Sequence, residues 1–160
     1  MGLDKSQFIA GIYDTGIPYM RAAGDASEGL LGIFGCALTN ETNLSGIKTM
    51  RRAFEKYHAP KTVIEDETSY ITYWLIADTT IEATKRAIKK VGYEKMTNKD
   101  VKAALESMNN YDNGGITHPL RFGEGVEGRR GNKHTRLCRL ENGAWKPITP
   151  WSEVPFLTGE

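Results

Sequence analysis

The 160-residue sequence predicts a layered α/β protein, because apolar strand-like runs and longer helical patterns follow one another along the chain. Two short apolar runs open the chain, at 6–13 and 29–38. Three segments with helical spacing follow, and two strand-like runs joined by Asn142 and Gly143 come last. Three helices require more sheet than these strands supply, so the pattern also predicts that part of the layered structure is missing.

The opening runs have the composition of buried strands. Residues 6–13, SQFIAGIY, lead into a turn that is indicated by Gly16 and Pro18. Residues 29–38, GLLGIFGCAL, are rich enough in glycine to predict a strand in close packing. A polar, turn-like stretch at 40–46 then separates this run from the first helical pattern.

The middle of the chain is typical of helices. Residues 47–57 place their apolar side chains on one face, and the helix is expected to end before Pro60. The longest helix is expected from residue 68 or 69 to residue 91, preceded by acidic residues at 65–67 that suit the positive end of a helix. Its beginning, 70–77, is apolar nearly all round, which predicts burial on several sides.

The third helix has the clearest local signal. Thr97 and Asp100 form a capping box, and the helix is expected to stop at the turn-like residues 109–115. A short strand is predicted at 120–122. Residues 134–148 then predict a β-hairpin, because strand-like runs flank an Asn-Gly turn.

Composition excludes several classes of protein. With 21 Lys and Arg against 20 Asp and Glu, the net charge of +1 gives no general attraction to nucleic acid or membrane surfaces. The longest apolar run, 30–38, is too short to span a bilayer. No secretion signal is recognisable, so either the protein is cytoplasmic or an export segment lies outside this sequence. Cys36 and Cys138 lack a CxxC motif and are expected to be buried free thiols, with a mutual disulfide as the alternative.

Residues 128–139, GRRGNKHTRLCR, form a locally basic segment. Clustered Lys and Arg can bind phosphate, but this segment has no interleaved aromatic residues for base stacking, so we expect no nucleic-acid partner. Two interpretations stay open. The segment is a solvated loop before a strand, or one of its Arg or His side chains contacts the carboxylate of a ligand.

No motif predicts catalysis. The histidines at 58, 118 and 134 lack the spacing of metal ligands, no serine lies in a GxSxG motif, and neither cysteine has a recognisable histidine base. The glycines at 109–115 and 123–128 lack the lysine and context of a phosphate loop. We therefore expect no enzyme, no catalytic residues, no cofactor and no metal.

Five segments, taken in order, resemble the branched-chain amino-acid binding proteins of ABC transporters. Each motif is weak alone, but the ordered set covers nearly the whole chain. The segments are GLDKSQFIAG at 2–11, AAGDASEGLLGIFG at 22–35, YITYWLIADTTIEATKRAIKKVG at 70–92, TNKDVKAALESMNNYDNGGITHPLRF at 97–122 and RLCRLENGAWKPITPW at 136–151.

This resemblance implies the type I periplasmic binding fold, in which two parallel-sheet lobes with flanking helices close on a ligand between them. It implies that the chain is truncated and holds only about the second half of such a protein. Residues 1–40 would end the second lobe, 41–122 would supply helices of the first lobe, and 123–160 would return to the second lobe with the C-terminal hairpin. The leading strands of the first lobe would be the missing sheet.

The resemblance also implies four ligand-binding candidates. Relatives often place a carboxylate for the ligand's ammonium group after the opening strand, where this sequence has Ile12. Tyr13 and Asp14 follow, and Asp14 would supply the carboxylate if the loop shifts, or else is an ordinary turn residue. Tyr73 matches an aromatic residue that lines the pocket, although it could equally fill a core.

The function implied by the resemblance is solute binding for an ABC-type uptake system. The ligand would be amino-acid-like or an aromatic or carboxylate compound, the partner a membrane permease, and the location of the full-length protein periplasmic or extracytoplasmic. The alternatives are a ligand-sensing receptor of the same fold, or a small protein-interaction module without a cleft. For the chain alone we expect exposed apolar surface around 70–77, through which it could form a homodimer.

Overall fold

The computed structural model describes residues 8–60, 64 and 67–155. The start of the first predicted strand, at Ser6 and Gln7, and the acidic residues Glu65 and Asp66 therefore lie outside the described residues. The described strands are β1 (Ile9–Ala10), β2 (Leu31–Phe34), β3 (His134–Glu141), β4 (Ala144–Pro147) and β5 (Ser152–Glu153). The described α-helices are α1 (Ile17–Ala23), α2 (Ser45–Tyr57), α3 (Glu67–Val91), α4 (Asn98–Glu106) and α5 (Gly125–Gly128). Single 3-10 turns form η2 (Ile12–Asp14), η3 (Gly24–Ser27) and η4 (Tyr93–Lys95).

The strands form one mixed sheet in the order β1-β2-β3-β4, with β5 paired to β3. β1 and β2 are parallel, whereas β2, β3 and β4 are antiparallel neighbours. The β3–β4 turn has Asn142 at φ 54° and Gly143 at φ 72°, the left-handed pair that a two-residue hairpin turn needs. The predicted hairpin is confirmed.

We call residues 8–34 and 134–153 the sheet part. Its core contains Phe34, Cys138, Leu140 and Trp145, together with Leu38 from the segment that follows β2, all with at most 7% of their surface exposed. The Trp145 ring meets the Phe34 ring edge to face, with 5.2 Å between centroids. The Trp145 indole donates a hydrogen bond of 2.8 Å to the carbonyl of Thr15, so the loop after β1 is attached to this core.

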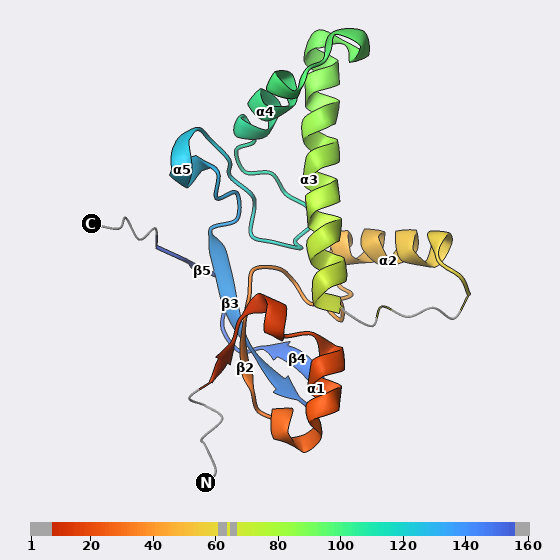
Figure 1. Cartoon of the computed structure of the whole chain (residues 1–160), viewed down its shortest axis with the longest axis vertical. Helices are drawn as coiled ribbons and strands as arrows, with labels where there is room; N and C mark the ends of the chain where they lie inside the picture. The colour runs from red at the N-terminus through yellow and green to blue at the C-terminus, as the bar shows by residue number, and fades with distance from the viewer. Residues whose placement is uncertain (1–7, 61–63, 65–66, 156–160) are drawn as a thin grey trace.

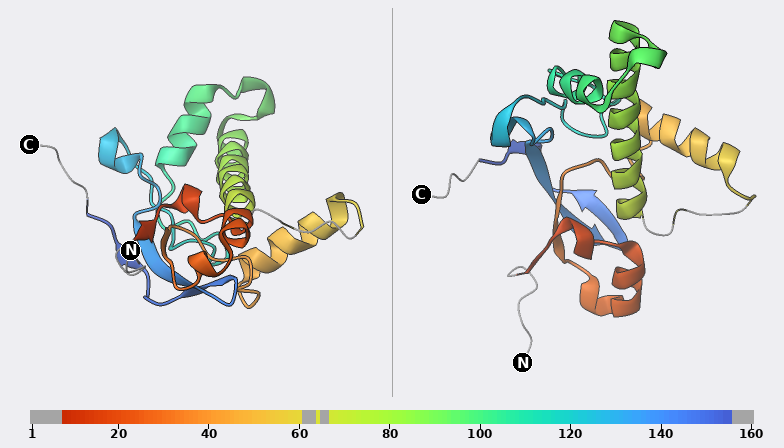
Figure 2. Two further views of the ribbon diagram at one scale, coloured as in Figure 1. Left: turned by 60° about the horizontal axis from the view of Figure 1, so that its bottom comes forward. Right: turned by 45° about the horizontal axis from the view of Figure 1, so that its top comes forward.

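We call residues 45–108 the helical part. Figure 1 shows α3 rising from the strands with α4 along its upper half and α2 projecting to one side, and the two views of Figure 2 agree. Its core is shared with the segment that follows β2, and consists of Cys36, Ala37, Ile47, Met50, Ile71 and Ile116. The predicted helices α2, α3 and α4 are confirmed, with both hydrogen bonds of the Thr97–Asp100 capping box present.

The N-terminal segment differs from the prediction. The strand expected at 6–13 is only β1, since the chain already turns into η2 at Ile12. Gly16 and Pro18 do not form the expected turn but lie at the start of α1. Proline suits the first turn of a helix, because the backbone N–H groups there have no hydrogen-bond partner within the helix. The seven residues of α1 are too few to show a recognisable helical pattern in the sequence, so this helix was not predicted.

Two further predictions are corrected. The strand expected at 120–122 is a single bridge between Leu120 and Tyr111, and the strand expected at 29–38 is only Leu31–Phe34. The start of α3 was expected to be buried on several sides, and this is wrong. Ile71 is 1% exposed, but Tyr73 is 72% and Ile76 is 56% exposed. The expected exposure of apolar surface at this end of α3 is therefore observed.

Both cysteines are buried free thiols, as expected, and no disulfide joins them. Burial raises the pKa of Cys36 to about 12 and the pKa of Cys138 to about 11, so both remain protonated and unreactive near neutral pH. Of the helices described, none combines the length and apolar character needed to cross a membrane.

Candidate functional site

A cavity of about 190 Å³ lies between the loop after β1 and the first turns of α3. It brings together residues that are some 60 positions apart in the sequence, including three of the four predicted ligand-binding candidates. The lining residues are Ile12, Tyr13, Gly16, Thr68, Ser69, Thr72, Tyr73 and Ile76.

Local hydrogen bonds fix the loop side of this cavity. The amide of Asp14 donates to the carbonyl of Gly11 at 2.9 Å, which closes the 3-10 turn η2. The Thr15 hydroxyl donates to the carbonyl of Ile12 at 2.7 Å, and Thr15 is fully buried. Since the Thr15 carbonyl accepts from Trp145, the loop is held to the core of the sheet.

The α3 side of the cavity follows from helical spacing. Thr68, Thr72 and Ile76 are four residues apart and therefore share one face of α3. The Thr72 hydroxyl donates to the carbonyl of Thr68 at 2.8 Å. The hydroxyl oxygens of Thr68 and Thr15 lie 3.4 Å apart, which connects the helix to the loop.

The four predicted candidates occupy different positions. Ile12 is half-buried and packs against the core of the helical part, whereas Tyr13 and Tyr73 are 86% and 72% exposed and lie at the open side. Asp14 is exposed and does not line the cavity. Its Oδ2 atom lies 3.5 Å from the position that a Cβ would take on Gly11, beside the turn.

Sequence reasoning missed the hydroxyl-bearing residues of this cavity. The signal was present as Thr68, Ser69 and Thr72 within the first turns of an otherwise apolar helix start. Polar side chains in an apolar turn indicate a face that contacts something other than core.

A second, larger groove of about 540 Å³ lies along the middle of α3, beside the first cavity, with which it shares Ile76. It is lined mainly by apolar side chains of α3, α4 and the segment that leads to β3. The lining residues are Leu75, Ile76, Thr79, Thr80, Ala83, Val101, Leu105, Thr117, Leu120, Phe122, Gly131 and Asn132. This groove is an extensive apolar surface that the described residues leave uncovered.

A largely buried ion pair connects the segment that follows β2 to the sheet part. Arg136 on β3 is 8% exposed and binds the Glu41 carboxylate through both terminal nitrogens. The same carboxylate accepts from the amide of Leu38 at 2.7 Å, and the Arg136 guanidinium lies 4.6 Å from the centre of the Trp151 ring. Burial by itself would raise the pKa of Glu41, but the hydrogen bonds from Arg136 and Leu38 and the positive charge of Arg136 outweigh it and lower that pKa.

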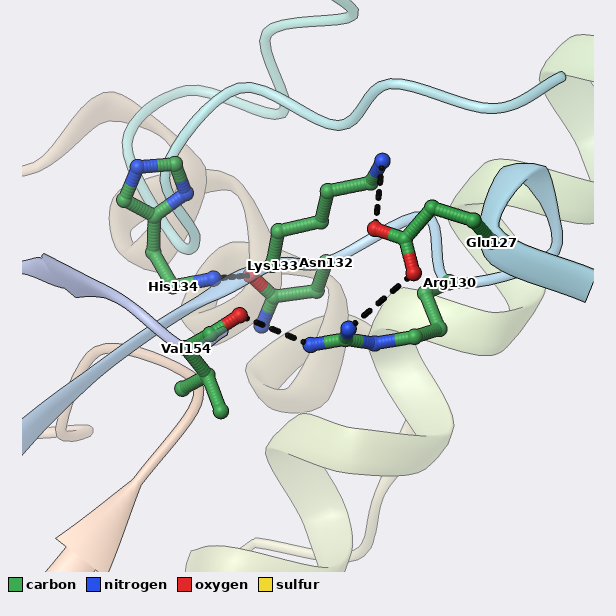
Figure 3. A network of polar contacts seen from close by, with 6 residues as sticks. All are labelled: Glu127, Arg130, Asn132, Lys133, His134 and Val154. Carbon is green, nitrogen blue, oxygen red and sulfur yellow. Dashed lines mark hydrogen bonds and ion pairs between the residues drawn. The ribbon is translucent and has the colours of Figure 1, made fainter. Parts of the chain in front are cut away.

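Two cations of the basic segment at 128–139 are paired with Glu127, the residue that precedes it. Glu127 binds Arg130 at 3.1 Å and Lys133 at 2.9 Å, as Figure 3 shows. Arg130 also donates to the carbonyl of Val154 at 3.0 Å. The hydrogen bond from Lys133, with the charges of both cations, lowers the pKa of Glu127 despite partial desolvation. Within the part of the chain that the structure describes, no group of three or more His, Cys, Asp or Glu residues is arranged to hold a metal ion.

No protein-family model matches the sequence, and no curated protein is similar enough to be matched. Several solved structures are similar in fold. A branched-chain amino-acid ABC transporter protein from Thermus thermophilus with bound valine superposes with a TM-score of 0.76 and 24% identity, over 91% of this chain and 39% of that chain. An ABC transporter permease from the Pseudomonas fluorescens group gives 0.74 and 18%, over 94% and 38% of the two chains. A leucine-binding protein from Thermotoga maritima gives 0.63 and 15%, over 88% and 36%.

The chain thus has the fold of part of a type I periplasmic binding protein, a mixed α/β structure with a sheet and flanking helices. It spans less than two fifths of the length of the proteins that it matches. At these identities the similarity establishes the fold, and the ligands of the matched proteins are properties of those proteins.

Proposed function

We propose that the chain is part of the solute-binding component of an ABC-type uptake system, and that the cavity between η2 and α3 is one wall of its ligand cleft. The observation that carries the proposal is that Ile12 and Tyr13 meet Tyr73 around one cavity. These residues were selected from the sequence as ligand-binding candidates, and nothing in their local sequence brings them together. Their convergence on a fold shared with amino-acid transport proteins supports a binding role.

The proposal assigns residues 1–40 and 123–160 to one lobe and residues 41–122 to the other. The groove of about 540 Å³ supports this assignment, because α3 and α4 present apolar side chains there with no sheet of their own to cover. In the complete binding protein a sheet would cover the groove. In the 160-residue chain alone, we expect self-association through it.

The mechanism would be closure of the two lobes around a solute, with motion at the joining segments. The Glu41–Arg136 pair supports this role for residues 35–44, since it holds Glu41 of that segment to the sheet part. On the other side, Arg51 of α2 donates two hydrogen bonds, of 3.0 and 2.8 Å, to the carbonyl of Thr39. The segment is thus attached to both parts, as a hinge must be.

The ligand would be a small amino-acid-like or aromatic or carboxylate compound. Tyr13 and Tyr73 offer large rings with polar tips, and Ile12 and Ile76 supply apolar surface, which suits a compound with an apolar body. A membrane permease would receive the loaded protein, and the full-length protein would act outside the cytoplasm.

A thermal-shift screen tests the proposal on the natural gene product that contains these residues. Amino acids and aromatic acids should raise the melting temperature, because a ligand that binds only the folded state stabilises it. Tyr73→Ala should reduce this shift. Tyr93→Ala is a matched control, since Tyr93 on η4 is also 72% exposed but does not line the cavity. If no solute changes the melting temperature, the proposal is wrong.

A further inference from the structure

The threonine hydroxyls at the α3 wall have a fixed hydrogen-bond polarity. A hydroxyl carries one proton, and the Thr72 hydroxyl uses it in the 2.8 Å bond to the carbonyl of Thr68. The Thr15 hydroxyl uses its proton in the 2.7 Å bond to the carbonyl of Ile12. At the 3.4 Å contact between Thr15 and Thr68, the donor must therefore be Thr68.

As a result, both Thr68 and Thr72 face the cavity with lone pairs and without a free proton. A ligand group beside them can gain a hydrogen bond only by donating one. A carboxylate would instead bring its own lone pairs against theirs, and a buried acceptor without a donor is costly. At these two positions the wall therefore discriminates by polarity, although none of the side chains that line the cavity is charged.

The tyrosines provide the opposite polarity at the open side. Tyr13 and Tyr73 are 86% and 72% exposed, and a phenol hydroxyl can donate as well as accept. A ligand acceptor would find its donors there. Ile12 and Ile76 supply the apolar part of the lining.

We propose, resting on the function proposed above, that the α3 wall receives the hydrogen-bond donor end of the ligand. The substrate class is a small molecule with an apolar body and an ammonium, hydroxyl or amide N–H group directed at Thr68 and Thr72. Any carboxylate of the ligand points away from this wall. Thr72 is then a specificity-determining residue through its oxygen acceptor.

Two matched ligand sets test the polarity by calorimetry on the natural gene product. The first is L-leucine, 3-methylbutylamine and 4-methylpentanoate, and the second is L-phenylalanine, 2-phenylethylamine and 3-phenylpropanoate. Within each set the apolar body is constant while the ammonium or the carboxylate is removed. The amine should bind at least roughly tenfold more tightly than the acid, the ratio expected for one hydrogen bond to a charged group.

Substitution at Thr72 then tests the residue. Thr72→Val should weaken binding of the ammonium-bearing ligands by roughly tenfold and leave the acids unchanged, while Thr72→Ser should retain wild-type affinity. Thr84→Val is the matched control, because the Thr84 hydroxyl makes the same bond of 2.8 Å to the carbonyl four residues earlier and lies outside the cavity.

Acids that bind as tightly as their amines, or an unchanged affinity in Thr72→Val, would overturn this inference and leave the proposed function standing. If another solute binds while these six do not, the Thr72→Val and Thr72→Ser comparison is made with that solute, and the same unchanged affinity overturns the inference. If no solute binds at all, the proposed function fails and the inference fails with it.

Discussion

The sheet part and the helical part of this chain differ in how completely each covers its own apolar surface. In the sheet part, Phe34 and Trp145 are 1% and 4% exposed and the loop after β1 is hydrogen-bonded into the same core. In the helical part, the core around Ile47 and Met50 is equally buried, but α3 and α4 also border an open apolar groove. The comparison shows that the sheet part buries the side chains of its core, whereas the helical part has a buried core and, beside it, an apolar surface that the described residues leave uncovered.

The largest loss of stability should follow removal of Trp145 from the core of the sheet part. Trp145→Ala removes a buried ring that packs against Phe34 and the indole bond to Thr15, and should cost about 3–5 kcal/mol of unfolding free energy. Chemical denaturation measures this loss. Trp145→Phe keeps an apolar ring but removes the N–H donor, and should cost less, about 1–3 kcal/mol. Equal losses in the two variants would show that packing against Phe34 is unimportant.

Breaking the ion pair between Glu41 and Arg136 should have the next largest effect. Glu41→Ala leaves the Arg136 guanidinium buried without its carboxylate and should cost about 2–4 kcal/mol. Adding Arg136→Met to this variant removes the stranded charge and should recover part of the loss. If the double variant is no more stable than the sum of the two single variants predicts, the pair does not act as a unit.

The same pair predicts a pH dependence. The pKa of Glu41 is lower in the folded chain than its ordinary value of 4.5, so the folded state binds its proton less readily than the unfolded state does. The stabilisation is therefore complete above that ordinary pKa and is lost as the pH falls through the lowered folded value. Unfolding free energies measured between pH 7 and acid should fall less steeply in Glu41→Gln than in wild type.

The open groove should tolerate truncation better than the closed core. Leu105 borders the groove and is only half-buried, so Leu105→Ala should cost about 1 kcal/mol in the 160-residue chain. Met50 is fully buried, and Met50→Ala should cost about 2–5 kcal/mol. A Leu105→Ala cost as large as that of Met50→Ala would contradict an uncovered groove.

The smallest effect is expected at the hairpin turn. Gly143 has φ 72° and open space around its Cα, so Gly143→Ala should cost about 1 kcal/mol through backbone strain alone. Gly11 is a suitable control because its φ is −70° and an added Cβ would meet only an ordinary contact. Gly11→Ala should leave the denaturation midpoint unchanged or slightly raised. The opposite ranking would contradict the left-handed turn.

Local signals explain what the sequence could predict. The Asn142-Gly143 pair specifies a hairpin turn, because Gly143 has no side chain and adopts the left-handed conformation easily. The side chains of Thr97 and Asp100 specify a helix start through the capping box, and both features are present in the structure. α3 ends at residue 91 as expected, and Gly92, which follows it, has φ 82°, a conformation that glycine favours. Fold class, the three longer helices and the hairpin therefore came from local chemistry.

Features decided by distant contacts could not be predicted in the same way. The strand before Ile12 ends at the 3-10 turn η2, and the loop after it is hydrogen-bonded through the Thr15 carbonyl to Trp145, a residue 130 positions away. α1 was misinterpreted because Gly16 and Pro18 fit a turn as well as a helix start. The resemblance identified the two tyrosines of the cavity. It could not identify the polarity of the α3 wall, because the hydroxyls of Thr68 and Thr72 acquire that polarity only from their hydrogen-bond partners.

Hydrogen–deuterium exchange on the natural gene product, with and without a solute that raises its melting temperature, tests most directly whether the cavity is one wall of a ligand cleft. Ligand should slow exchange at amides of 12–16 and 68–76, which carry the residues that line the cavity. Protection confined to 101–105 and 117–132, beside the apolar groove, with 12–16 and 68–76 unchanged, would contradict the account.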